Sequence, residues 1–184
     1  HEYETERDNK SLLAKYLYKK MEKIFINSSD YTITVSESIM SEYKKLYNIS
    51  NIQLVYNAPF YSSHISSNIF REKFKINQDH KIYIYQGKFS RSRGVEKYIE
   101  VFKQLKDFKC CLILMGYGDL IDDVQKAAEN NNNIFYHNPV KLKEIQNYTS
   151  SADYGLNITN NTCLSRYYAL PNKLFEYAMA RIPL

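Results

Sequence analysis

From Lys81 onward, short apolar segments typical of β-strands alternate with longer segments typical of helices. The expected strands are KIYIYQ (81–86), CCLILM (110–115), residues 134–137 and residues 154–158. CCLILM is apolar without interruption, which is typical of a strand buried on both faces of a parallel sheet. The expected helices are residues 94–106, 119–129, 140–150 and 172–181. This alternation predicts an α/β fold of right-handed βαβ units, with an open parallel sheet and helices on both faces.

The residues before this sheet contain a second α/β pattern. It consists of a charged helical stretch at about 6–25, a strand at 31–35, a helix from the expected cap Ser36 to Tyr47, and a strand at 52–56. Asn57-Ala58-Pro59 breaks that strand. The polar residues up to 80 lack either periodicity. We therefore expect a first segment at 1–58, a linker at 59–80 and a domain at 81–184.

Composition narrows the class of protein. The chain has 184 residues, 44% hydrophobic and 24% charged, an ordinary globular balance. It lacks a run of about eighteen apolar residues that could span a membrane. The net charge of +5 fits anionic partners, but the lysines are scattered instead of forming the basic stripe of a nucleic-acid binder. Cys110, Cys111 and Cys163 follow no disulfide or zinc spacing, and no secretory signal is visible, so we expect a cytoplasmic protein without a metal site.

In such sheets, ligands bind beyond the carboxyl ends of the strands, which directs attention to the loops there. The first loop, Gly87-Lys88-Phe89-Ser90-Arg91-Ser92-Arg93-Gly94, joins a strand to a helix and supplies three cations, two glycines and a helix N-terminus. These features suit a diphosphate, since each charge-assisted hydrogen bond contributes about 1.5–3 kcal/mol. An exposed basic turn explains the loop on its own equally well.

Two further loops are candidates for the same site. Gly116-Tyr117-Gly118-Asp119 follows a strand, and Asp119 can cap the next helix; a tight turn explains it without a ligand. Leu170-Pro171-Asn172-Lys173 opens the last helix, where Asn172 can cap and free amides with Lys173 face whatever lies at that end. Glu176 lies one turn further, where its carboxylate can accept hydrogen bonds from ribose hydroxyls. A surface lysine and a glutamate that stabilises the helix dipole are the alternative.

These three loops, in this order and at these separations, resemble the GT-B-fold retaining glycosyltransferases of family four (glycosyl transferases group 1). The similarity runs across nearly the whole chain. YTITVSESIMSEYKKLYNISNIQLVYNAP resembles the end of the family's N-terminal, acceptor-side domain. YQGKFSRSRG resembles the loop that opens its donor-binding domain, and LPNKLFEYAMARIP resembles its closing motif in the variant P-N-K-x-F-E-Y. The resemblance implies two Rossmann-like domains, the first and the last parts of which are missing from this chain.

The resemblance also implies residue roles. Lys88 and Arg93, between Gly87 and Gly94, bind the diphosphate of the donor. Lys173, with the amides near Asn172, approaches the same phosphates or the sugar, and Glu176 holds the ribose. The turn at Gly116 shapes the nucleotide pocket, and the backbone around Pro139 and Val140 meets the base. His1 matches the histidine that faces the reacting sugar.

Two positions depart from the family pattern. Tyr168 stands where the family often has a glutamate near the transferred sugar, a glutamate that the P-N-K variant commonly lacks. Arg181 stands where glycine is usual in the turn after the helix. The first departure concerns recognition of the sugar.

The activity that the resemblance implies is transfer of a sugar, with retention, from a nucleotide-diphosphate donor to a glycan or lipid-linked acceptor in surface polysaccharide assembly. A lipid-linked acceptor would place the intact enzyme at the inner membrane face. Cations and a helix N-terminus would stabilise the departing diphosphate in place of a metal ion, and no cofactor is expected beyond the donor. A nucleotide-sugar epimerase of the same fold, or a catalytically silent nucleotide-sugar-binding module, would use the same loops. We expect the isolated 184 residues to be inactive.

Overall fold

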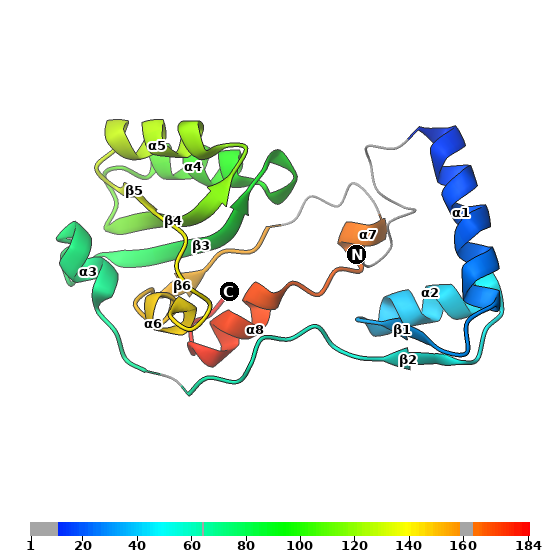
Figure 1. The fold of residues 1–184 in the computed structure, drawn as a ribbon. Coiled ribbons are helices and arrows are strands. Elements are labelled where there is room, and N and C mark those ends of the chain that lie inside the picture. Colours follow the sequence, from blue (N-terminus) through cyan, green and yellow to red (C-terminus); the bar gives the residue numbers. More distant parts are fainter. Residues whose placement is uncertain (1–10, 64, 159–163) are drawn as a thin grey trace. The chain divides into compact units, whose positions relative to one another are not determined.

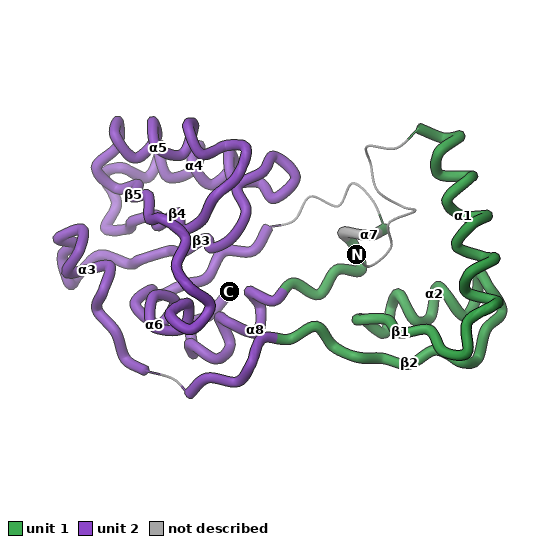
Figure 2. The backbone as a smooth tube through the Cα atoms, viewed as in Figure 1, with its two compact units in different colours: residues 1–58, 161–171 green, residues 59–160, 172–184 purple. Residues whose placement is uncertain are grey.

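The computed structural model describes residues 11–63, 65–158 and 164–184. The chain divides into two compact units, which Figure 2 shows in different colours. Unit 1 comprises residues 1–58 and 161–171, and unit 2 comprises residues 59–160 and 172–184. Each unit is described by itself.

Unit 2 is built on a four-stranded parallel sheet with the order β5-β4-β3-β6. The strands are β3 (Lys81–Phe89), β4 (Cys110–Gly118), β5 (Ile134–His137) and β6 (Tyr154–Gly155). The chain runs outward from β3 to β5 and then returns to place β6 on the other side of β3. The strand order therefore reverses between β3 and β6, and ligands of open α/β sheets bind at such a reversal, beyond the carboxyl strand ends.

Helices cover both faces of this sheet (Figure 1). One face packs against α4 (Val95–Gln104) and α5 (Ile121–Asn130) through a core that includes Tyr85, Leu112 and Leu114. The other face packs against α3 (Ile69–Phe74), α6 (Ile145–Thr149) and α8 (Asn172–Met179) through a core that includes Ile84, Ile113 and Tyr177. Side chains alternate between the faces along each strand. The predicted fold class, an open parallel sheet with helices on both faces, is confirmed.

The first residues of two predicted loops are corrected, because Gly87–Phe89 belong to β3 and Gly116–Gly118 belong to β4. β3 and β4 stay paired through Gly87↔Gly116 and Phe89↔Gly118. A Cβ on Gly116 would lie 1.9 Å from the carbonyl oxygen of Gly87, so this close approach requires glycine. Both strands consequently extend further toward the candidate site than their apolar runs do.

The helix after β5 starts later than expected, and the turn after α8 contains a residue with a left-handed backbone. The helix expected from residue 140 begins only at Ile145, because Lys141 and Glu144 first form a turn in which Glu144 N donates to Lys141 O at 2.8 Å. Arg181, one of the two positions where the sequence departs from the pattern it resembles, has a left-handed backbone with φ 58°. That conformation closes the turn after α8 and is one that glycine adopts more readily.

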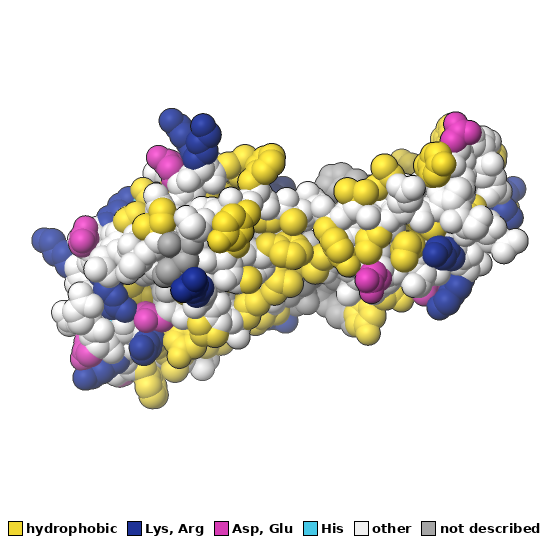
Figure 3. Space-filling model, turned by 90° about the horizontal axis from the view of Figure 1, so that it is seen from below, with side chains coloured by type: hydrophobic (Ala, Val, Ile, Leu, Met, Phe, Trp, Pro, Cys, Tyr) yellow, Lys and Arg dark blue, Asp and Glu magenta, His cyan; other side chains and the backbone are white. Residues whose placement is uncertain are grey.

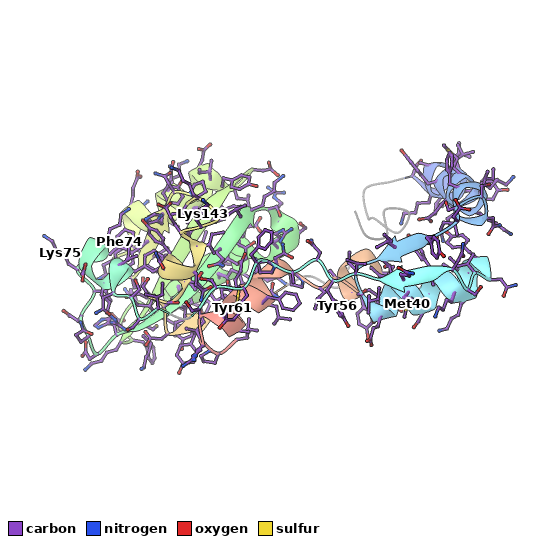
Figure 4. The ribbon with its side chains drawn as sticks, turned by 60° about the horizontal axis from the view of Figure 1, so that its bottom comes forward. Met40, Tyr56, Tyr61, Phe74, Lys75 and Lys143 are labelled. Atoms are coloured by element: carbon purple, nitrogen blue, oxygen red, sulfur yellow. The ribbon has the colours of Figure 1, made fainter. Side chains whose placement is uncertain are left out.

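The segment expected to be a linker contains α3. Phe70 on this helix is fully buried, and its ring lies 5.7 Å from that of His137. Phe74 stacks on Phe135 at 4.8 Å (Phe74 is labelled in Figure 4), and Arg71 pairs with Asp153 at 2.8 Å. The correction has a physical reason: two phenylalanines one turn apart give even this six-residue helix an apolar side, which the sheet buries.

The extended chain before α3 also packs within unit 2. Ser62 N lies 3.4 Å from Met179 Sδ on α8, and Tyr61, labelled in Figure 4, lines a shallow cavity with Met179 and Arg181. Residues 59–80 are therefore part of unit 2 as folded. Which domains of a larger protein the two units represent stays a prediction.

Unit 1 contains one βαβ unit. The elements of unit 1 are α1 (Leu12–Asn27), β1 (Thr32–Thr34), α2 (Glu37–Tyr47), β2 (Ile52–Leu54) and α7 (Leu164–Tyr167). Of these, β1, α2 and β2 form the βαβ unit. β1 and β2 pair in parallel, and Ser36 caps α2 as predicted by accepting from Ile39 N at 3.3 Å. Within the described ranges, no helix is long and apolar enough to cross a membrane.

Candidate functional site

The candidate site lies at the carboxyl edge of the sheet in unit 2, where the strand order reverses. Three segments contribute to it: the end of β3, the 3-10 turn Arg91–Arg93 with the start of α4, and the start of α8. Parallel strands in register bring these ends to one edge. The segment after β6 joins them, since a Cβ on Gly94 would lie 3.7 Å from Ile158 Cγ2.

Lys173 lies at the centre of this site. Its side chain is only 6% exposed, and its Nζ lies 3.8 Å from the centre of the Tyr85 ring. It also lies 3.8 Å from the place that a Cβ on Gly87 would occupy, so the glycine leaves room for the ammonium group. Burial, reinforced by the charge of Arg93, lowers the pKa of Lys173 to about 7, and the carboxylate of Glu176 opposes that shift.

Arg93 reaches the same surroundings. Tyr85 is fully buried and donates from its hydroxyl to Lys88 O at 2.9 Å. Burial raises the pKa of Tyr85 to about 12, while the charge of Arg93 and its hydrogen bond to the phenol act in the opposite direction. Arg93 and Lys173 therefore share the ring of Tyr85 as a neighbour. Two like charges held together in this way favour an anion between them.

Lys88, the third predicted cation, is engaged differently. Its side chain is half exposed, and its Nζ lies 3.7 Å from Asp119 Oδ2. The expectation that Asp119 caps the next helix is wrong, because α5 starts at Ile121 after Leu120 and has no side-chain cap. The structure thus brings Arg93 and Lys173 together. It pairs Lys88, near the end of β3, with the carboxylate of Asp119, which follows the neighbouring strand β4.

Glu176 belongs to a polar chain that sequence reasoning missed. Gln86, only 5% exposed at the end of the apolar part of β3, donates from Nε2 to Glu176 Oε2 at 2.5 Å. Thr149 Oγ1, on α6, lies 2.7 Å from Gln86 Oε1. A signal was present in the sequence: Gln86 is the polar last residue of KIYIYQ, where its position in a buried strand requires a polar partner.

The other predicted residues belong to several elements of unit 2. Gly94, with φ 67°, ends the 3-10 turn and precedes α4. Gly116 lies in β4 beside Gly87, and Asn172 is the exposed first residue of α8 instead of its cap. Val140 follows β5 and packs partly buried against the core that contains Tyr177. Their predicted ligand contacts stay predictions.

Two predicted positions remain, His1 and Tyr168. His1, the expected catalytic residue, lies outside the described residues. Tyr168 packs against the small hydrophobic core of unit 1, with Ile39 and Tyr43. Among the residues that the structure describes, no three His, Cys, Asp or Glu side chains gather as metal ligands would. That the reaction needs no metal ion stays a prediction.

The charges on one face of unit 2 can be compared with those that a nucleic-acid-binding surface requires. In Figure 3, Lys and Arg side chains on this face are interspersed with acidic and hydrophobic ones. A continuous basic stripe, which phosphate-backbone binding requires, is not visible on it.

Comparison with known proteins supports the fold. No protein-family model and no curated protein matches this chain in sequence. Among solved structures, Staphylococcus aureus TarM in complex with UDP and alpha-GlcNAc-glycerol is similar, with 15% identity, a TM-score of 0.68, and coverage of 96% of this chain and 34% of that one. WaaG, a glycosyltransferase involved in lipopolysaccharide biosynthesis, has 16% identity and a TM-score of 0.66, with coverage of 95% and 50%. Anabaena HepE in complex with UDP-glucose has 12% identity and a TM-score of 0.69, with coverage of 91% and 47%.

The similarity shows that the chain has the GT-B fold. Because the identities are low, it shows the fold alone. The chain spans between a third and a half of the length of these structures. Family four and the P-N-K motif variant stay predictions from the sequence.

Proposed function

We propose that this chain is part of a retaining glycosyltransferase and that unit 2 binds its nucleotide-diphosphate sugar. One observation carries the proposal: Arg93 and the buried Lys173 meet at Tyr85, beside Glu176, at the strand reversal of a GT-B-like sheet. Two cations near one aromatic ring, with a carboxylate on the same helix as one of them, match a ligand that is anionic at one end and rich in hydroxyls at the other.

In this proposal the diphosphate lies between Arg93 and Lys173, with the amides at the start of α8 facing it. Departure of the nucleoside diphosphate builds negative charge on its β-phosphate. Cations and helix amides already aimed at that position stabilise the charge without reorganisation. Lys88 would contribute by exchanging Asp119 for a phosphate oxygen, and the step would need no metal ion.

The remaining contacts hold the nucleoside. Glu176 accepts hydrogen bonds from the ribose hydroxyls, the backbone at Val140 meets the base, and Gly116 shapes the nucleotide pocket. His1 would face the transferred sugar. UDP in the TarM complex and UDP-glucose in the HepE complex make uridine diphosphates the first ligands to test.

The wider assignment follows the same similarity. We assign residues 1–58 to the acceptor-side domain and residues 81–184 to the donor-binding domain. The acceptor would be a glycan or a lipid-linked glycan of surface polysaccharide assembly, which WaaG exemplifies for lipopolysaccharide. Such a protein would work in the cytoplasm, at the inner membrane face when its acceptor is lipid-linked.

A thermal-shift panel of UDP, GDP, ADP and their sugars tests donor binding. Because a ligand that binds only the folded state stabilises it, we expect the correct nucleotide at about a hundred times its Kd to raise the melting temperature by roughly 5 °C. Lys173→Met keeps the side-chain volume but removes the charge, and it should greatly reduce the shift. Lys103→Met, on the exposed side of α4, is the matched control and should not. A panel without any shift would overturn the proposal.

Activity assays separate the alternatives. The 184-residue chain should bind the donor but transfer no sugar, since it spans at most half of the related structures. In the full-length protein, isomerisation of the free nucleotide sugar without acceptor would indicate the epimerase. Binding without any turnover would indicate a silent binding module.

A further inference from the structure

Gln86 connects three elements that are far apart in the sequence. Its amide lies at the carboxyl end of β3, between Glu176 on α8 and Thr149 on α6. The side chains of Gln86 and Thr149 are almost completely buried, at 5% and 0% exposure. Neither can exchange its partner for water without moving. A buried amide with partners at both ends is held in one place.

The chemistry of the partners fixes which way the amide points. A carboxylate only accepts hydrogen bonds, so the NH2 group of Gln86 must face Glu176. Its carbonyl oxygen then faces Thr149, whose hydroxyl donates. That hydroxyl also lies 2.8 Å from Ile145 O, so its single proton is shared between two acceptors and the threonine is tied to the backbone of α6.

The contact leaves one carboxylate oxygen for a ligand. Gln86 engages Oε2 of Glu176. Among the residues that the structure describes, Oε1 has no hydrogen-bond donor. Glu176 is itself partly exposed and lies on the first turn and a half of α8, beside Lys173.

We propose that Gln86 is a positioning residue that aims Glu176 at the ribose of the donor, and that Thr149 prevents the amide from turning. This rests on the proposed function, in which Glu176 holds the ribose. By anchoring Oε2, Gln86 restricts the carboxylate to a rotamer that presents Oε1. A free glutamate would lose rotamer entropy on binding, a cost that the anchor removes beforehand.

Binding of UDP, 2′-deoxy-UDP and inorganic pyrophosphate to the complete chain, measured by calorimetry, tests this proposal. One charge-assisted hydrogen bond corresponds to a loss of about ten- to a hundredfold in affinity, so wild type should prefer UDP over 2′-deoxy-UDP by about that factor. Gln86→Leu should reduce the preference to about threefold or less while pyrophosphate binds as in wild type. A purely structural role would instead lower the affinity for all three ligands together.

Thr149 supplies a second, milder test. Thr149→Val removes the hydroxyl but keeps the shape, and it should reduce the preference for UDP partially. Thr149→Ser retains the hydroxyl and should keep the wild-type preference for UDP. These two variants carry the test if circular dichroism shows Gln86→Leu to be unfolded.

The outcomes distinguish a failure of the positioning role from a failure of the proposed function. If Glu176→Gln abolishes the ribose preference but Gln86→Leu and Thr149→Val keep it at the wild-type value, the positioning role is refuted and the proposed function stands. If wild type binds none of the three ligands, the proposed function fails, and the positioning role fails with it.

Discussion

The ammonium nitrogen of Lys173 lies 3.8 Å from the centre of the Tyr85 ring, in a site where burial leaves the lysine 6% exposed. The electron-rich face of an aromatic ring stabilises the charged lysine only in part. Burial and the nearby Arg93 lower the pKa of Lys173 to about 7, from an ordinary value of 10.5. The ring of Tyr85 and the carboxylate of Glu176 compensate the charge of Lys173 only in part, so a bound anion would stabilise the charged form further.

The first prediction is that nucleotide binding depends on the protonation of Lys173. With a pKa of about 7, the lysine loses its proton as the pH rises above neutrality. A bound diphosphate favours the charged form and raises this pKa, so binding takes up a proton. The affinity of UDP should fall about tenfold between about pH 7 and pH 8.5, a window above the last phosphate titration. Calorimetry in buffers of different ionisation enthalpy measures both effects.

Lys173→Met supplies the comparison for this experiment. The variant should bind UDP more weakly, with an affinity that is nearly constant over the same pH window and without proton uptake. If wild type and the variant have the same pH dependence, some other group is responsible.

The second prediction concerns the glycine contact between β3 and β4. Because a Cβ on Gly116 would lie 1.9 Å from a backbone oxygen, Gly116→Ala must separate the two strands. We expect a loss of at least about 3 kcal/mol in the free energy of unfolding. At Gly94 a Cβ has room, with its nearest neighbour at 3.7 Å, and only the positive φ opposes it. Gly94→Ala should therefore cost only about 1–2 kcal/mol, and equal urea midpoints for the two variants would contradict the assignment.

The third prediction concerns Arg181. Its φ of 58° is a left-handed conformation that costs a side chain with a Cβ about 1 kcal/mol. Arg181→Gly should stabilise the chain by roughly 0.5–1 kcal/mol, measured by urea unfolding. The stabilisation should be absent from Arg181→Ala, which keeps the Cβ and removes only the guanidinium. Equal stability of the two variants would show that the left-handed backbone does not limit stability here.

The fourth prediction tests the packing of α3. Phe70 is fully buried against the sheet, so Phe70→Ala should reduce the free energy of unfolding by about 3–5 kcal/mol. Phe60 lies in the same stretch of sequence but is 99% exposed, so Phe60→Ala should be close to neutral. A flexible linker across residues 59–80 would give two small and similar effects instead.

Much of the fold was predictable because its signals are local. CCLILM predicts a strand buried on both faces, and the following amphipathic segments predict the helices, because periodicity depends only on neighbouring residues. The ends of the elements were less predictable. β4 continues through Gly116 because Gly87 of the neighbouring strand pairs with it, a partner that the sequence around Gly116 does not reveal. Likewise α3 is a helix because the sheet buries Phe70.

The sequence by itself determined the alternation of strands and helices from Lys81 onward, the parallel sheet, and the two loops that carry cations to its carboxyl edge. The tertiary structure decided which of these side chains meet. It placed Lys173 over Tyr85, joined Gln86 to Glu176 across 90 residues of chain, and paired Lys88 with Asp119 instead. Charge and hydrogen-bond partners in a buried site come from elements that pack together only after folding, so burial and partner identity are properties of the assembled sheet.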